Sequence, residues 1–177
     1  MKVYKGISAS PGLVMGQVSR LEHHTELSSG SPLDPEREQQ LLIDAIRIAQ
    51  EELRTMSERS GSSEQAIFLF QSMMLEDESF LDEVRSYIAA GSGAAAAIDR
   101  VGQRYADQLA GMKDNPYLQL RSVDILDATL RVVNILSNRP REWMALDHPV
   151  VLAADLLMPS DLFSLPNRSR WPRLTSL

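Results

Sequence analysis

The residues of this chain that could carry out chemistry are few. It has no cysteine, which excludes disulfides, thiolate chemistry and cysteine-based zinc sites. His23 and His24 are adjacent in a polar loop and have no third ligand nearby in sequence, so solvated loop residues are a better interpretation than a metal site. His148 precedes a proline and fits a turn. With no glycine-rich phosphate loop, G-x-S-x-G or H-E-x-x-H motif, the motifs favour a helical interaction protein without catalytic or metal-binding residues.

The segment IFLFQSMMLEDESF, residues 67–80, is the most unusual stretch. Its apolar run ends with Met73, Met74 and a leucine, and three acidic residues follow directly. Neighbouring residues of a helix are about 100° apart, so three consecutive apolar side chains cannot all face a core. Methionine is also common at adaptable binding surfaces, because it is unbranched and polarisable. Core packing is the alternative, but the pattern favours an exposed surface at Met73 and Met74 that binds a partner.

The elements that must position this segment are mostly helices. Two early segments, KVYKGI and GLVMGQVSRL, predict strands because they alternate or are rich in β-branched and apolar residues. Caps, prolines and apolar spacings of three and four then predict five helices. They begin at Pro35 after Asp34, after Ser63, near Asp77, near Ala94 and at Pro116 after Asn115. The second is expected to gather Ala66, Ile67, Phe70, Met73 and Met74 on one side.

The order of the elements predicts the fold class. HPVVLAADLL after the helices predicts a buried strand, and MPSD predicts the start of a short helix. The chain is therefore expected to be mainly α, with a helical bundle inserted into an incomplete α/β unit whose early strands pair with Val150–Ala153. The predicted boundaries are 1–22, 23–140 and 141–177. Three strands with hardly any following helix cannot cover both faces of a parallel sheet, so the α/β unit is incomplete in this chain.

Charge and hydropathy narrow the range of partners. The formal net charge of −6 and the absence of a long basic run exclude nucleic acid as a favoured partner, whereas a basic protein would fit. No apolar stretch approaches the ~18 residues of a membrane span. The N-terminus has no apolar signal region, which favours a cytoplasmic protein without a membrane association.

Four segments together resemble one family. GISASPGLVMGQV at 6–18 is similar to the N-terminal G-I-x-A-S-P-G signature of enzyme I of the bacterial sugar phosphotransferase system, a phosphoenolpyruvate–protein phosphotransferase. QAIFLFQSMMLEDESFLDEV, NPYLQLRSVDILDATLRVVNIL and PVVLAADLLMPSD resemble later segments of that family, in the same order. Each match is weak alone. Together they span residues 6–161, and the chain is identified as resembling the N-terminal domain of enzyme I.

The resemblance implies an architecture and an activity. In the family, a helical subdomain binds the phosphocarrier protein HPr and is inserted into a phosphohistidine α/β subdomain. A separate C-terminal barrel binds phosphoenolpyruvate and Mg²⁺ and forms the dimer. The G-G-x-x-S-H motif of the phosphohistidine and the whole barrel are absent from this sequence. We therefore expect a truncated or frameshifted gene product, or a fragment, of a phosphotransferase. It is expected to dock HPr, to need no cofactor of its own and to be inactive alone.

The resemblance also implies which residues contact HPr. The expected contacts are the apolar Met73, Met74, Phe80 and Leu109 and the polar Glu78 and Arg121. Gln71 stands where the family usually has a histidine; glutamine keeps a donor and an acceptor but loses the titratable charge. Two alternatives to a phosphotransferase part stay open at this point. One is a non-catalytic regulator or decoy that sequesters HPr, and the other is a helical scaffold without function.

Overall fold

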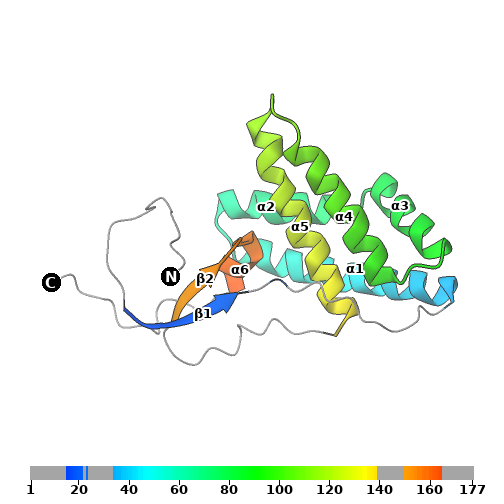
Figure 1. Cartoon of the computed structure of the whole chain (residues 1–177), viewed down its shortest axis with the longest axis horizontal. Helices are drawn as coiled ribbons and strands as arrows, with labels where there is room; N and C mark the ends of the chain where they lie inside the picture. The colour runs from blue at the N-terminus through cyan, green and yellow to red at the C-terminus, as the bar shows by residue number, and fades with distance from the viewer. Residues whose placement is uncertain (1–14, 22, 24–33, 139–149, 165–177) are drawn as a thin grey trace, which may run out of the picture.

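The computed structural model of the chain describes residues 15–21, 23, 34–138 and 150–164 (Figure 1). Five helices form a bundle, and two short strands with a sixth helix lie at one end of it (Figure 1). The elements are β1 Gln17–Leu21, α1 Pro35–Glu58, α2 Ser62–Met74, α3 Glu78–Ala89, α4 Ala94–Ala110, α5 Pro116–Leu136, β2 Val150–Ala154 and α6 Pro159–Ser164. The expectation of a mainly α chain is confirmed.

The ends of the long helices follow the predicted signals. Asp34 caps α1, where its carboxylate accepts hydrogen bonds from the backbone N–H groups of Glu36 and Arg37. Asn115 caps α5 by accepting from the backbone N–H of Leu118 at 3.2 Å. Both helices begin with proline, whose missing N–H costs nothing at this position. The predicted starts of α1 and α5 are therefore confirmed.

Of the three shorter helices, α3 and α4 begin where the sequence predicts, and α2 begins differently. The residue before α2 is Gly61, which makes no side-chain cap, so the prediction that Ser63 caps this helix is wrong. Asp77 caps α3 by accepting from the backbone N–H of Phe80 at 2.8 Å. α4 has no cap of its own, and Glu38 of α1 supplies one by accepting from the backbone N–H of Ala94 at 2.8 Å. This buried carboxylate ties the start of α4 to α1.

The core lies between α1, α4 and α5, with α2 and α3 packed against them (Figure 1). α4 and α5 run side by side, and Gly102 of α4 packs against Thr129 of α5. A Cβ atom on Gly102 would lie 2.3 Å from the Thr129 methyl carbon, far inside contact distance. Glycine therefore lets the two helices pack closely. The largest fully buried apolar side chains of the bundle are Phe68, Phe80, Leu53, Leu75, Ile88 and Ile98.

The two strands bring distant parts of the chain together. β1 and β2 pair in parallel, from Gln17 opposite Val150 to Leu21 opposite Ala154, so all of α1–α5 lies between two paired strands. The predicted pairing of an early strand with Val150–Ala153 is confirmed. β2 is half-buried, with Ala153 exposed, so the prediction of a buried strand is wrong. The strand predicted in KVYKGI lies outside the described residues, and no observation tests the three predicted domain boundaries.

Candidate partner-binding surface

The two sides of α2 differ in what they face. Phe68, Gln71 and Leu75 point into the protein and are no more than 1% exposed. On the opposite side, the Leu69 and Met73 side chains are 59% and 62% exposed. These two residues are four positions apart, so they are neighbours on the helix surface. α2 therefore exposes two neighbouring apolar side chains that no described part of the chain covers.

The start of α5 carries a second set of exposed apolar side chains. Tyr117 and Leu120 are 62% and 73% exposed, and they lie three positions apart on one face of the helix. Arg121 connects this face to α2, because its guanidinium lies 4.9 Å from the centre of the Tyr117 ring and 5.1 Å from that of Phe70. We call Leu69, Met73, Tyr117 and Leu120 the apolar strip.

Arg121 is held firmly at this junction. One guanidinium nitrogen pairs with the Asp124 carboxylate at 2.8 Å, and another donates to the Tyr117 hydroxyl at 2.7 Å. The side chains of Arg121 and Asp124 are only 14% and 8% exposed. Burial raises the pKa of Asp124, and the Arg121 guanidinium opposes that shift. Arg121 is therefore held by its neighbours on α5, contacts α2 through the Phe70 ring, and offers little free charge to a partner.

The corner between α2 and α3 is acidic. Glu76 accepts a hydrogen bond from the Gln50 amide at 3.1 Å, and Asp77 is occupied as the cap of α3. Glu78 pairs with Arg85 at 3.1 Å, but its side chain is 77% exposed. The side chain of Glu78 can thus exchange Arg85 for another cation at low cost, since exposed ion pairs are weak.

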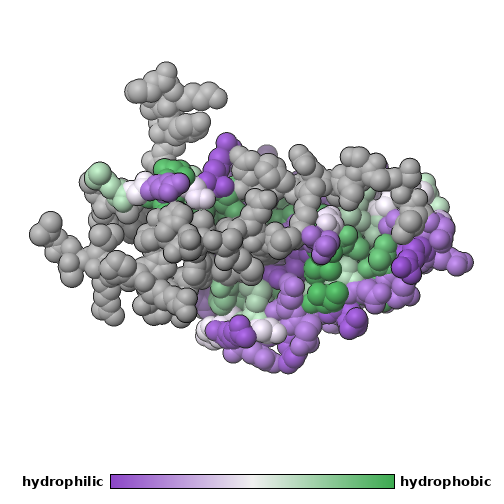
Figure 2. All heavy atoms as spheres, turned by 90° about the horizontal axis from the view of Figure 1, so that it is seen from below, coloured by the Kyte–Doolittle hydropathy of each residue, from purple (hydrophilic) through white to green (hydrophobic). Residues whose placement is uncertain are grey.

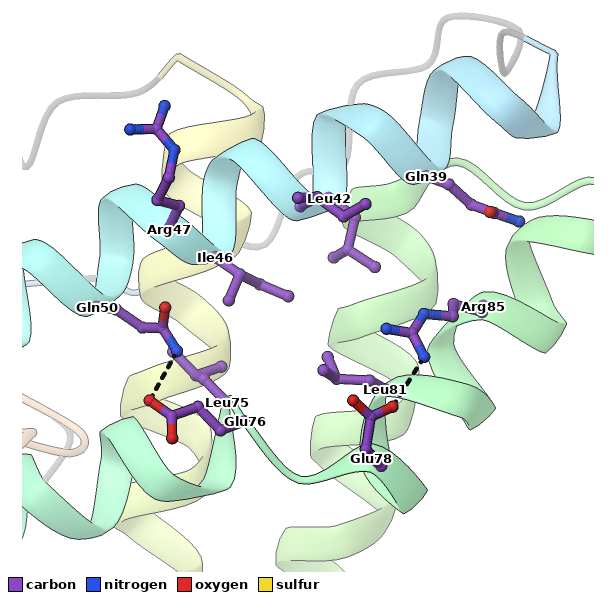
Figure 3. A pocket seen from close by; sticks show the side chains of 11 residues that line it. Gln39, Leu42, Ile46, Arg47, Gln50, Leu75, Glu76, Glu78, Leu81 and Arg85 are labelled. Carbon is purple, nitrogen blue, oxygen red and sulfur yellow. Dashed lines mark hydrogen bonds and ion pairs between the residues drawn. The ribbon is translucent and has the colours of Figure 1, made fainter.

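A groove lies between this corner and α1 (Figure 3). It has a volume of about 340 Å³, with Leu42 and Ile46 of α1 facing Leu75 and Leu81 across it. Polar and charged side chains form its rim, and Glu76 and Glu78 lie on the side of the acidic corner (Figure 3). Figure 2 shows apolar side chains exposed on the side of the bundle where α1 lies. The carboxylates that line the groove are those of Glu76 and Glu78.

Neither a metal site nor a membrane span is found in the described ranges. No group of three or more histidine, aspartate or glutamate side chains in residues 15–21, 23, 34–138 and 150–164 is placed to hold a metal ion. Within the same residues, no helix is both long and apolar enough to cross a membrane.

Comparison with known proteins identifies the family. Residues 5–121, more than half of the chain, match the family described as PEP-utilising enzyme, N-terminal. The chain belongs to this family. Its curated relatives include the phosphoenolpyruvate-protein phosphotransferases of Streptococcus equinus and Bacillus subtilis, each 28% identical over 93% of this chain. The chain spans only 30% of the length of each of these relatives.

Solved structures of this family share the fold. The chain superposes on the N-terminal domain of Enzyme 1 – Nitrogen with a TM-score of 0.66 and 29% identity, covering 89% of this chain and 67% of that one. A solution structure of Enzyme I (nEIt) matches in fold, with a TM-score of 0.67 and 24% identity, over 91% of this chain and 68% of that one. The resemblance to the N-terminal domain of enzyme I is confirmed.

The structure separates the six residues that the family resemblance implies as partner contacts. Met73 and Glu78 are exposed, and Arg121 is the partly buried link between α2 and α5. Leu109 is half-buried and packs on the core. Phe80 is fully buried beside the Tyr105 ring, so it has no surface to offer and its expected role as a contact is wrong.

The two methionines of the opening segment have different environments. Met73 is 62% exposed, but Met74 is 9% exposed and belongs to the hydrophobic core. The prediction that both are exposed is therefore wrong for Met74. The reason is helical geometry: Met74 lies about 100° further round α2, on the side of Phe68 and Leu75. The argument that consecutive apolar residues cannot all face inward was correct, and it applied to one of the pair.

Sequence reasoning missed three exposed members of the apolar strip. Leu69, Tyr117 and Leu120 were not expected at the surface, although each is more than half exposed. The sequence could have indicated that Leu120 is exposed. It stands between the polar residues Gln119 and Arg121 near the start of α5, and it is not part of the run of apolar residues further along this helix. Leu69 had no such signal, since it lies within the continuous apolar run IFLF.

Proposed function

We propose that this chain supplies the docking surface for the phosphocarrier HPr within a phosphoenolpyruvate–protein phosphotransferase. The observation that carries the proposal is the apolar strip of α2 and α5, fixed around Arg121. The family match supports a phosphotransferase context, and the named relatives are phosphoenolpyruvate-protein phosphotransferases. The residues described here supply a partner-binding surface, and the proposal assigns them no chemical step.

The chemistry of the strip suits a protein partner. Leucine, methionine and tyrosine side chains that stand more than half exposed in one neighbourhood gain free energy when a partner covers them. Tyrosine is enriched among the residues that dominate interface energies, and methionine adapts to irregular partner surfaces. Arg121 preorganises the strip, because its stacking on Phe70 and Tyr117 holds two helices in register before a partner arrives.

The charges beside the strip favour a basic partner. Glu78 is exposed at the corner that follows Met73, and Glu76 lies one turn beyond Met73. HPr proteins, as the family resemblance implies, carry basic residues around their active histidine. Acidic groups at the edge of the surface would speed the encounter and orient such a partner. A scaffold without function is the weaker alternative, because an uncovered apolar strip promotes non-specific association.

Met73 and Met74 provide a matched test, since they are adjacent and chemically identical but only Met73 is exposed. We expect Met73→Ala to weaken HPr binding roughly tenfold or more if it lies at the centre of the interface. The same change should alter the free energy of unfolding by less than about 0.5 kcal/mol. Met74→Ala should instead lower the free energy of unfolding by about 2–5 kcal/mol, because it opens a cavity in the core.

Calorimetric titration of HPr into each variant, with thermal melts of the same samples, separates the two effects. Titrations are run well below the melting temperature of the Met74→Ala protein, so that both variants are folded. Unchanged HPr affinity in Met73→Ala and in Leu120→Ala would reject the docking surface. A loss of affinity that tracks the loss of stability in both methionine variants would reject the distinction between a surface and a core methionine.

A further inference from the structure

The carboxylate of Asp127 on α5 is fully buried and joins three elements. One oxygen accepts a hydrogen bond from the Gln71 side-chain amide of α2 at 3.0 Å and from the backbone N–H of Ser160 in α6 at 2.9 Å. The other oxygen accepts from the Ser160 hydroxyl. We call Gln71, Asp127 and Ser160 the Asp127 joint. All three residues are fully buried.

The rest of α6 is held from other sides. The Phe163 ring meets the Phe68 ring of α2 edge-on, with the ring centres 4.8 Å apart. Asp161 accepts from the backbone N–H of Met158 at 2.8 Å and lies 2.8 Å from a ring nitrogen of His23, just after β1. α6 thus contacts α2, α5 and the segment after β1 within six residues. In the joint, Ser160 bonds α5 directly at Asp127, and Asp127 in turn bonds Gln71 of α2.

Because the Asp127 joint is buried, its hydrogen bonds tolerate little change in the position of α6. A carboxylate removed from water is tolerated only when hydrogen-bond donors surround it, and each donor left without an acceptor is costly in turn. A small shift of α6 would break the bonds from the Ser160 N–H and hydroxyl together. Apolar contacts such as Phe163 on Phe68 tolerate sliding, because burial is not directional. The joint is therefore the part of this contact that selects one orientation.

We propose that Asp127 is a positioning residue that fixes α6, and with it the end of β2, in one orientation on the helical bundle. Gln71 completes the joint from α2 through its amide nitrogen. Among the described residues, its buried amide oxygen has no hydrogen-bond partner, so the bond that Gln71 makes in this joint is the one it donates to Asp127. The proposal concerns the join between the bundle and the β2–α6 segment, and it is independent of HPr docking.

The test uses the full chain and hydrogen–deuterium exchange resolved by peptide. Asp127→Leu keeps a buried side chain of similar size but leaves the Gln71 and Ser160 donors without their acceptor. We expect amide exchange in residues 158–164 to accelerate roughly tenfold or more, since bonds to a charged acceptor are lost. Exchange in α1, α3 and α4 should stay near that of the unmodified chain. Ser160→Ala should have a smaller effect on the same peptide.

Two further variants give the proposal its specificity. Asp127→Asn retains an amide oxygen for the Ser160 N–H and Gln71, and its own amide can donate to the Ser160 hydroxyl, so most protection of 158–164 should return. Asp99→Leu is the matched control, a partly buried aspartate on α4 outside the joint, and it should leave 158–164 protected. Protection of 158–164 that survives Asp127→Leu would overturn the proposal. Equal acceleration across all helices would also overturn it, by showing that Asp127 supports the whole core.

Discussion

The helical bundle and the β1–β2 sheet differ in how they are stabilised. The bundle buries apolar residues from each of α1–α5 in one cluster, and many of them are fully inaccessible. In contrast, every residue of β1 and β2 is exposed or half-exposed, and Val18 of β1 is 64% exposed. We therefore expect the bundle to fold on its own packing, and the sheet to depend on the elements to which it is attached.

This difference indicates where the chain can tolerate change. Two paired strands are marginally stable in water, and a parallel pair normally needs cover on both faces. In the described residues, the β2 end gains its attachment to the bundle through α6, by Phe163 on Phe68 and by the Asp127 joint. Substitutions in the bundle core should thus affect global stability, and substitutions in the strands should not.

The largest effect is expected at Gly102, where α4 packs against Thr129 of α5. A Cβ atom there would lie 2.3 Å from the Thr129 methyl carbon and 2.7 Å from its hydroxyl oxygen, so the helices must move apart. We expect Gly102→Ala to lower the free energy of unfolding by more than about 3 kcal/mol, at the upper end of overpacking effects. Urea denaturation followed by circular dichroism measures the change.

Thr129 offers a compensating control for that variant. Thr129→Ala removes the two Thr129 atoms nearest to the new methyl group, and its lost hydroxyl bond goes only to backbone carbonyls of α5. Adding Thr129→Ala to Gly102→Ala should therefore recover part of the lost stability. If the double variant is no more stable than Gly102→Ala alone, the close contact between α4 and α5 does not set the cost.

A polypeptide of residues 34–138 tests the independence of the bundle directly. It keeps the core but loses the contacts that Met158 and Phe163 make with the bundle, so we expect its free energy of unfolding to be lower by roughly 2–3 kcal/mol. Its helices should still melt in one cooperative transition. Circular dichroism and dye binding report the outcome. A non-cooperative transition with dye binding would show that the sheet unit is part of the same folding unit, and would move the predicted domain boundaries.

The sequence predicted the parts of the fold that depend on local signals. Asp34, Pro35, Asn115 and Pro116 act at the helix ends within a few residues of themselves, so no tertiary contact was needed to interpret them. The apolar spacing of α4 was equally informative, since Ile98 and Val101 are fully buried. The pairing of β1 with β2 could be predicted from topology rules. Strands that flank an inserted helical bundle usually belong to one sheet, so the strand after the bundle is expected to pair with a strand before it.

The facing of α2 could not be predicted from apolar spacing. The apolar side expected from the spacing grouped Ala66 and Met73 with Met74, but Ala66 and Met73 are exposed and Met74 is buried, and the inward side includes Gln71. A glutamine is buried there because Asp127, 56 residues away in sequence, accepts its hydrogen bond. Phe80 was expected as a partner contact from its position in the family, and the sequence did not show that the Tyr105 ring of α4 packs against it in the core. Both errors depend on partners that are distant in sequence.

A pair of valines measures the contrast between bundle and sheet with one chemical change. Val132 of α5 is fully buried, and Val18 of β1 is 64% exposed. Val132→Ala should lower the free energy of unfolding by about 2 kcal/mol through lost burial and a small cavity. Val18→Ala should change it by less than about 0.5 kcal/mol. Comparable losses in the two variants, measured by urea denaturation, would show that the strand contributes to the core.

The smallest effect is expected at Asp99. A substitution there tests whether a partly buried charge lowers the free energy of unfolding of the bundle. Burial raises the pKa of Asp99 on α4, so the folded chain holds this proton more tightly than the unfolded chain. Stability contributed by Asp99 is therefore present at low pH and is lost as pH rises from the unfolded pKa, near 3.8, through the higher folded pKa. At neutral pH the ionised carboxylate is a net cost.

Asp99→Asn should remove that cost while keeping the size of the side chain. Because Asp99 is only partly buried, the gain at pH 7 should be only a few tenths of a kcal/mol, or roughly 1 °C in melting temperature. The gain should shrink as the pH falls toward 4 and the wild-type carboxyl becomes neutral. Thermal melts of both proteins between pH 4 and pH 7 measure it. A gain of equal size at every pH would assign the effect to hydrogen bonding or packing, and the burial of charge on α4 would then cost nothing measurable.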